Sequence, residues 1–361
     1  MRRRAFIATG GLGLAGAALA APAIAQTQPE IKWRLAASWP KSLDTLYGGA
    51  EFVAKRVAEA TDNKFQIRAF AGGEIVPPLQ VLDAVQNNTV EMGHTASYYY
   101  VGKDMTFGLD CTIPFGMNAR QMIAWMTHGG GLELLRNFFK DYNVVNFPAG
   151  NTGTQMGGWW RKEIKTVDDL KGVKFRIGSG LAGAIFAKLG VVPQTIPGGD
   201  IYPSLEKGTI DAAEWVGPYD DEKLGFYKVA KYYYTPGWWE GQAQLSTYVN
   251  LGQWEKLPKS YQAILAAACA EANSWMLAKY DADNVAAMRR LIANGTELRG
   301  FSKEILDACY KATLEVYADL SAKNPKWQAI YEPYKKFLDD ELQWFRVAEQ
   351  TFDNFMLSQK R

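Results

Sequence analysis

The chain has 361 residues, of which 48% are hydrophobic, with 40 lysines and arginines against 38 aspartates and glutamates. This length and composition permit two lobes, each with a large apolar core. A nearly neutral charge balance gives no electrostatic surface for nucleic acid or an anionic membrane, so we exclude both as partners.

Residues 1–25 have the composition of an export signal. Three arginines (Arg2–Arg4) precede a glycine- and alanine-rich apolar run that ends at Ala23–Ala25 in the pattern of a cleavage site. The arginines resemble a twin-arginine signal, but a plain basic start fits general secretion as well, so the route stays open. Because the apolar run is shorter than the ~20 residues of a membrane span, we expect a mature protein in the periplasm. Removing this segment leaves 37 basic and 38 acidic residues.

Few side chains suit a disulfide framework or a soft-metal site. The three cysteines (Cys111, Cys269 and Cys309) are not spaced as a zinc site, and His94 and His128 are the only imidazoles. Chemistry that uses carboxylates stays possible.

The first part of the chain alternates strand and helix patterns, which predicts an α/β lobe. The expected strands are 31–37, 65–71, 90–94 and one that begins at 144–147, and the expected helices are 46–60, 79–85 and 117–142, the last broken at Gly129–Gly131. Three consecutive tyrosines, Tyr98–Tyr100, follow a strand end. Because they cannot all face one way on a strand, we expect at least one to reach a cleft if the others pack.

The segment 173–215 reads strand, helix, strand, helix, strand, which predicts a second α/β unit with crossover connections. Arg176 lies at the end of its first strand and Glu214 at the end of its third. Ligands bind outside the carboxyl ends of strands in such sheets, and an arginine there suits a two-point grip on a carboxylate or phosphate.

The same segment contains a second motif, Gly178–Gly183, which fits G-x-G-x-x-G between a strand and a helix, with Asp200 about 20 residues on. This pattern is typical of dinucleotide binding, but glycines at a strand-to-helix turn are common for backbone reasons alone. The run 191–196, which has to present the ribose-binding acid, contains Pro193 and polar residues. An exported oxidoreductase that binds a dinucleotide at Gly178–Gly183 is therefore kept only as the alternative function.

Beyond residue 230 the pattern is strand, strand and then almost all helix. Strands are expected at 231–235 and 244–251, helices at 261–291, 302–321 and 327–356, the last interrupted near Pro333. The first of these helices contains no proline or glycine and spans on the order of 45 Å, enough to lie across both lobes. The last has an apolar stripe, which favours either the core or another subunit.

These patterns divide the chain into five parts. We expect an export signal (1–25), the first part of lobe I (26–150), lobe II (151–247), a return to lobe I with the spanning helix (248–300), and C-terminal helices (301–361).

Three segments resemble a known family. DLKGVKFRI at 169–177, LG-x-x-P at 189–193 and YPSLEKGTIDAAEW at 202–215 occur in this order in the solute-binding proteins of TRAP transporters (tripartite ATP-independent periplasmic transporters). The resemblance extends from about residue 31 to 356 and is greatest to the branch that binds 2-oxo acids such as pyruvate, or 2-hydroxy acids such as lactate, with a metal ion. It implies two α/β lobes that close on the ligand, no enzymatic activity, and a membrane permease as partner.

The resemblance also implies site residues. Arg176 corresponds to the residue that pairs with the ligand carboxylate, and Tyr100 and Asn151 fall on further pocket positions. The implied cation ligands are Gln155, Glu214, the backbone carbonyl of Trp215, and Glu240, with Gln155 also facing the ligand. Oxygen ligands of this kind suit Na⁺, Ca²⁺ or Mg²⁺ and not zinc or copper; we expect Na⁺, with Ca²⁺ as the alternative. The branch also forms homodimers by exchanging the C-terminal helix, which suits the apolar stripe.

A third interpretation, an interaction protein that uses only the C-terminal helices, leaves the charged and aromatic residues of the cleft without a purpose.

Overall fold

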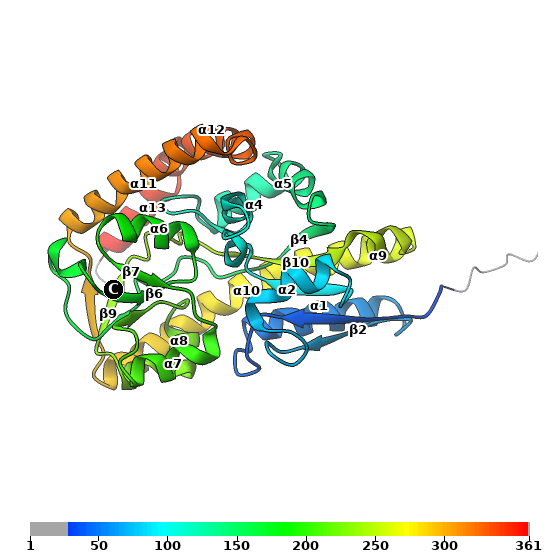
Figure 1. Ribbon diagram of the computed structural model, residues 1–361, viewed down its shortest axis with the longest axis horizontal. Helices are drawn as coiled ribbons and strands as arrows, with labels where there is room; N and C mark the ends of the chain where they lie inside the picture. The colour runs from blue at the N-terminus through cyan, green and yellow to red at the C-terminus, as the bar shows by residue number, and fades with distance from the viewer. Residues whose placement is uncertain (1–27, 360–361) are drawn as a thin grey trace, which may run out of the picture.

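The computed structural model describes residues 28–359, so the export signal predicted at 1–25 lies outside the described residues. Two β-sheets lie side by side, each flanked by helices, and one long helix runs behind both (Figure 1). We call the parts built on the first and second sheet lobe I and lobe II. The predicted two-lobed α/β architecture is confirmed. Between residues 28 and 359 no helix is long and apolar enough to cross a membrane.

Lobe I is built on a five-stranded sheet in the order β2-β1-β3-β10-β4. β1 runs parallel to β2 and β3, whereas β10 runs antiparallel to both β3 and β4. The strands are β1 (Ile31–Ala37), β2 (Phe65–Phe70), β3 (Met92–Thr95), β4 (Val144–Asn151) and β10 (Gln244–Asn250). The helices are α1 (Leu46–Ala60), α2 (Val81–Gln86), α3 (Gly108–Cys111), α4 (Ala119–Thr127), α5 (Gly131–Lys140) and α9 (Leu251–Lys256), with 3₁₀ turns η1 (Pro78–Gln80), η2 (Ser97–Tyr100) and η3 (Met105–Phe107).

Lobe II is built on a six-stranded sheet in the order β11-β9-β5-β8-β6-β7. β6 runs parallel to its neighbours β7 and β8, so the carboxyl ends of these three strands meet at one edge. The strands are β5 (Trp159–Trp160), β6 (Lys174–Arg176), β7 (Val192–Gln194), β8 (Ala212–Ala213), β9 (Tyr232–Thr235) and β11 (Glu297–Gly300). The helices are α6 (Gly180–Lys188), α7 (Gly198–Glu206) and α8 (Pro218–Leu224), with 3₁₀ turns η4 (Asp168–Leu170) and η5 (Phe226–Lys228).

Local sequence explains where several elements begin. α4 begins at a capping box in which Asn118 and Gln121 bond each other's backbone N–H groups. The predicted break at Gly129–Gly131 is confirmed: Gly130 has φ 85°, a left-handed conformation that glycine adopts readily, and α5 starts after it.

The spanning helix α10 (Lys259–Ala293) has 35 residues, slightly more than predicted, and packs on β4 and α1 in lobe I and on α8 in lobe II. β11 follows it and was not predicted. It pairs in parallel with β9, and this partner is distant in sequence.

The C-terminal helices are α11 (Lys303–Lys323), α12 (Pro325–Val347) and α13 (Glu349–Ser358). The interruption predicted near Pro333 is wrong, because α12 continues through it and the chain breaks instead at Ala348. A proline inside a helix costs about 3 kcal/mol, but Ile330 and Tyr334 on either side are buried, and the Tyr334 hydroxyl accepts the Met117 N–H at 2.8 Å. This packing holds the helix together.

We expect His94 to make folding sensitive to acid. Trp39 Nε1 donates to His94 Nδ1 at 2.8 Å, and His94 Nε2 lies 3.1 Å from the Ala149 carbonyl oxygen, so the ring is neutral. Burial lowers the pKa of His94 to about 4. Since the unfolded chain takes up this proton near pH 6.5, this group destabilises the fold as the pH falls from there, by about 3 kcal/mol at pH 4.

Urea unfolding at pH 7 and pH 4 checks this expectation. The wild type should lose about 3 kcal/mol more on acidification than His94→Gln, whereas the exposed His128→Gln control should follow the wild type. Equal losses in wild type and His94→Gln would show that the buried ring is not the cause.

Candidate functional site

The site is organised around a buried arginine at the end of β6. Arg176 Nη1 lies 2.5 Å from Glu214 Oε1 and donates to the Glu214 carbonyl oxygen at 2.8 Å, while Nε donates to the Ile196 carbonyl at 2.9 Å. Both side chains of the ion pair are 1% exposed. The pair forms because β6 and β8 are adjacent parallel strands whose carboxyl ends coincide, as the sequence predicted. Trp215 completes it, with its ring 5.0 Å from the guanidinium carbon.

Glu214 is held in place on one side only. Its Oε1 accepts the Gly178 N–H at 2.5 Å as well as Arg176, whereas Oε2 has no hydrogen-bond partner among the described residues. Burial raises the pKa of Glu214, and the neighbouring Arg176 charge opposes the rise.

Glu240 comes to the same place from the segment between β9 and β10. Its backbone N–H donates to the Gly237 carbonyl at 2.9 Å, and its carbonyl accepts the Gln155 N–H at 3.1 Å. A side chain at Gly237 would place Cβ 2.7 Å from the Met156 carbonyl, so the two crossing segments approach this closely only with glycine there. Glu240 is fully buried, and neither carboxylate oxygen has a partner in the described chain.

Burial raises the pKa of Glu240 well above its usual range, and the charge of Glu214 adds to the rise. Tyr98 and Gln155 lie close enough to moderate it, but neither makes a hydrogen bond of ordinary geometry with the carboxylate. Gln155 donates its Nε2 to Thr152 Oγ1 at 3.1 Å, which leaves its own Oε1 without a donor.

The orphaned acceptors form a chemically consistent set. They are Gln155 Oε1, Glu214 Oε2, Glu240 Oε1 and Glu240 Oε2, all buried and all without a donor in residues 28–359. Buried oxygens without donors are costly, and a hard cation with oxygen ligands removes that cost. The described chain has no group of three or more His, Cys, Asp or Glu side chains placed for a metal. The four oxygens without donors fit a hard cation held by two carboxylates and a neutral amide oxygen.

A small cavity adjoins this set between the lobes. Its free volume of about 10 Å³ is close to that of one water molecule. Lobe I contributes Trp39, Tyr98 and Tyr99 to its lining, and Gln155 and Trp215 line the other side. Arg176 Nη2 is also buried without a partner in the described chain, so one donor remains for an anion.

Tyr100 and Asn151 do not line this cavity. The Tyr100 hydroxyl lies in the core of lobe I, 2.8 Å from Thr95 Oγ1 and 3.2 Å from the Leu82 nitrogen. Asn151 donates to Gln242 Oε1 at 2.8 Å and accepts the Gly153 N–H at 2.9 Å, so both ends of its amide are engaged. Among the three tyrosines it is Tyr98 and Tyr99 that reach the cavity; the 3₁₀ turn that sorts them was not visible in the sequence.

The glycines of this motif make close packing contacts, Gly180 with lobe I and Gly183 within lobe II. A Cβ at Gly180 would lie 2.1 Å from Val101 Cγ2, and one at Gly183 would lie 3.3 Å from Pro193 Cβ. Asp200 is exposed in the first turn of α7. These glycines allow close packing, which counts against the dinucleotide interpretation.

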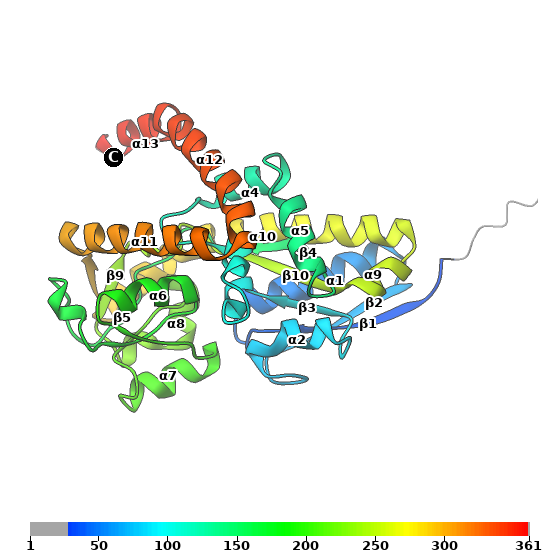
Figure 2. The ribbon, with the colours of Figure 1, turned by 45° about the horizontal axis from the view of Figure 1, so that its top comes forward.

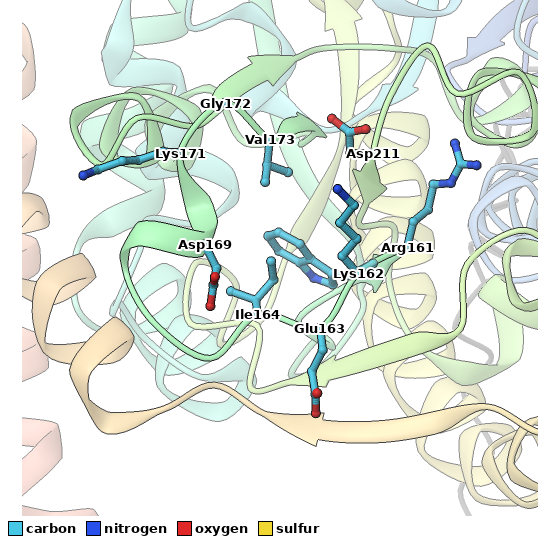
Figure 3. A pocket seen from close by; sticks show the side chains of 10 residues that line it. Arg161, Lys162, Glu163, Ile164, Asp169, Lys171, Gly172, Val173 and Asp211 are labelled. Atoms are coloured by element: carbon cyan, nitrogen blue, oxygen red, sulfur yellow. The ribbon is translucent and has the colours of Figure 1, made fainter.

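A larger pocket of about 570 Å³ lies at the opposite edge of the lobe II sheet (Figure 3). Its acids have partners: Glu163 pairs with Arg299 at 2.7 Å and Asp211 accepts the Lys174 N–H at 2.9 Å. Lys174 and Asp211 lie at the amino-terminal ends of β6 and β8, away from the edge where ligands bind in such sheets.

Comparisons with known proteins agree with this geometry. Residues 35–324 match the family described as bacterial extracellular solute-binding protein, family 7. The monocarboxylate 2-oxoacid-binding periplasmic protein of Nostoc sp. (strain PCC 7120) is 49% identical over 99% of this chain and 100% of its own length.

Two solved structures are similar in fold and sequence. A TRAP transporter solute-binding protein from Bordetella bronchiseptica RB50 is 56% identical with a TM-score of 0.91, covering 92% of this chain and 98% of its own. It is a mixed-occupancy dimer, with copurified calcium and picolinate in one active site and an apo site. A TRAP periplasmic solute-binding protein from Pseudoalteromonas atlantica T6c, with bound sodium and pyruvate, is 37% identical with a TM-score of 0.88, covering 92% of this chain and 100% of its own.

We expect that neutralising Glu240 stabilises the protein when no cation is available. Glu240→Gln removes a buried charge and supplies a donor, so in excess chelator it should unfold at a higher temperature, with a gain of about 1–3 kcal/mol. Thermal unfolding followed by circular dichroism measures this. The exposed Glu255→Gln control should not move the midpoint, and a lower midpoint for Glu240→Gln would contradict the assignment of unpaired buried charge.

Proposed function

The chain belongs to bacterial extracellular solute-binding protein family 7 and is a solute-binding protein of the TRAP type, and from this premise we propose that it captures a small 2-oxo monocarboxylate such as pyruvate. A 2-hydroxy acid such as lactate is the closest alternative. The ligand is bound together with a cation, in the periplasm after removal of residues 1–25, and delivered to a TRAP membrane permease. The sequence analysis divided the chain at residues 150 and 247; because all of β10 pairs in the lobe I sheet and β11 pairs in the lobe II sheet, we propose the second boundary near residue 243 and assign β11 to lobe II.

The observation that supports this proposal is the set of four orphaned oxygens beside one unpaired guanidinium nitrogen. A ligand carboxylate at Arg176 Nη2 gains a charge-assisted hydrogen bond. A cation held by Gln155, Glu214, Glu240 and the Trp215 carbonyl would be the partner of the 2-oxo group next to that carboxylate. The size of the acid is proposed from the relatives, because a cavity of about 10 Å³ has room for one water molecule and not for a six-atom acid.

The ion is proposed from charge and from the relatives. Glu214, Glu240 and a ligand carboxylate carry three negative charges against one positive charge on Arg176, so Ca²⁺ makes the site neutral and Na⁺ leaves one negative charge. The Bordetella protein holds calcium and the Pseudoalteromonas protein sodium. Charge neutrality and the more similar of these two relatives favour Ca²⁺, so we propose Ca²⁺ first and Na⁺, the ion expected from the sequence, second.

Isothermal calorimetry of the mature protein with pyruvate tests the proposal. After chelation, binding should require added Na⁺ or Ca²⁺, and Arg176→Ala should abolish it because the guanidinium grips the ligand carboxylate. Arg161→Ala, at the other pocket of lobe II, is the matched control and should bind as the wild type does.

Wild-type affinity in Arg176→Ala would remove this residue from the site. Pyruvate binding that is indifferent to cations would return Glu214 and Glu240 to a structural role. No binding of pyruvate, lactate or longer 2-oxo acids by the wild type would overturn the proposed ligand class.

We also propose a homodimer formed through the C-terminal helices. α13 projects away from the body of the chain after α12 (Figure 2). Large apolar side chains there are exposed: Trp344 is 58% exposed, Val347 71%, Phe352 63%, Phe355 62% and Leu357 85%. A patch of this kind on a folded protein is typical of an interaction surface, and the Bordetella relative is a dimer.

Light scattering after size-exclusion chromatography checks the dimer. The double variant Phe352→Asp/Phe355→Asp should be monomeric where the wild type is dimeric, because charges replace the apolar contact. Val285→Asp, an exposed apolar position on α10, should leave the dimer intact. A monomeric wild type at micromolar concentration would overturn the proposal.

A further inference from the structure

A cluster of polar contacts joins the two lobes outside the ligand site. Asp44 and Thr45 lie in lobe I, immediately before α1. Their partners lie on α8 of lobe II and on α10, which packs against α8. α8 follows Glu214 and Trp215 after only two residues, so the helix that contacts lobe I is directly attached to the site segment.

In the outer part of the cluster, charged and polar side chains contact the Asp44 carboxylate. Tyr219 donates its hydroxyl to Asp44 at 3.0 Å, Lys223 pairs with the same carboxylate, and the Lys279 ammonium lies 3.3 Å from it. The Lys223 ammonium also lies 3.9 Å from the centroid of the Tyr219 ring. Two cations and one hydroxyl therefore hold a single lobe I carboxylate.

The inner part of the cluster is a buried hydrogen bond between Thr45 and Asp220. Thr45 Oγ1 donates to Asp220 Oδ1 at 2.6 Å, and the Tyr280 hydroxyl donates to Oδ2 at 2.7 Å. Both Thr45 and Asp220 are fully buried. Thr45 occupies the N-cap position of α1, where a threonine hydroxyl usually accepts a backbone N–H, yet it makes no capping bond. The hydroxyl is used between the lobes instead of within its own helix.

The neighbouring acid on α8 faces the site segment. Asp221 Oδ1 accepts the Val216 N–H at 3.2 Å, and Oδ2 accepts the Tyr233 hydroxyl at 2.7 Å and Trp159 Nε1 at 2.9 Å. Adjacent residues of one short helix thus bond lobe I and the segment that follows Glu214 and Trp215. A movement of α8 relative to lobe I is transmitted to that segment.

We propose that Asp44 and Thr45 of lobe I, with Tyr219, Asp220 and Lys223 of α8, form an interlobe latch that stabilises the closed conformation and slows release of the bound acid. The proposal rests on the proposed function, in which the lobes close on a ligand. A contact changes ligand affinity only through the difference in its strength between the open and closed conformations. The latch is an additional determinant of release because none of its residues lines the ligand cavity.

Two variants break the latch with little change in volume, Thr45→Val and Asp44→Asn. Loss of the buried hydrogen bond to Asp220 predicts pyruvate dissociation about tenfold faster or more in Thr45→Val, and loss of the half-exposed charge predicts about two- to fivefold faster dissociation in Asp44→Asn. Association should stay within about twofold of wild type in both variants. Stopped-flow tryptophan fluorescence with pyruvate and Na⁺ or Ca²⁺ measures both rates. Thr127→Val and Lys41→Met are the matched controls, since each changes an exposed contact within lobe I, and both should release pyruvate at the wild-type rate.

A second measurement does not depend on the ligand. The described cysteines (Cys111, Cys269 and Cys309) are all buried, so spin labels at Glu51→Cys and Lys207→Cys report the distance between the lobes. In ligand-free protein, Thr45→Val and Asp44→Asn should shift the distance distribution towards separated lobes. Unchanged release rates and distances in folded variants would overturn the latch. If the wild type binds no pyruvate, the proposed ligand fails, and the distances alone decide on the latch.

Discussion

The site depends on an ion pair between Arg176 and Glu214 that is excluded from solvent at the carboxyl ends of two adjacent parallel strands. Desolvating two charges is expensive, and the pair tolerates it because both partners also bond backbone groups: Arg176 donates to two carbonyls and Glu214 accepts the Gly178 N–H. These bonds involve Nη1 and Nε of Arg176 and only Oε1 of Glu214. Arg176 Nη2 and Glu214 Oε2 have no hydrogen-bond partner among the described residues. The same pair that anchors the strand ends therefore presents a donor for an anion and an acceptor for a cation.

Several acids of this protein are buried, so burial alone does not distinguish the carboxylates of the candidate site. What distinguishes them is that they lack hydrogen-bond donors. Asp110 is fully buried, but Ser246 and Asn146 donate to its carboxylate at 2.7 Å each, and Ser97 donates as well. Asp221 receives three donors and Asp220 two, although burial raises the pKa of Asp220 to about 6 and that of Asp221 to about 7. Glu240 receives none. Neutral donors satisfy the structural acids, whereas Glu240 and Glu214 Oε2 require a partner that the described chain does not supply.

The sequence was informative where local pattern decides structure. The strand–helix–strand–helix–strand pattern of residues 173–215 placed Arg176 and Glu214 at strand ends of one sheet, and the long run without glycine or proline predicted α10. The sequence was uninformative where contacts between residues far apart in the chain determine the structure. β11 exists because β9 pairs with it, α12 continues through Pro333 because its neighbours are buried, and a 3₁₀ turn directs Tyr98 and Tyr99, not Tyr100, to the cavity. Gln155 and Glu240 converge on Glu214 through crossings between lobes that no local pattern reveals, so only family resemblance pointed to them.

The two sets of interlobe groups act in opposite directions on closure. In the proposed closure, carboxylate oxygens without donors disfavour the closed ligand-free conformation, because they are desolvated and because Glu214 and Glu240 repel each other. The contacts of Asp44 and Thr45 with α8 favour it. A balance between these two contributions keeps the free-energy difference between the open and closed conformations small. A ligand with a cation then shifts the population towards the closed conformation, because it removes the cost of the unpaired carboxylate oxygens. In this proposal the latch determines how long the closed conformation lasts, and the oxygens without donors determine which ligand stabilises it.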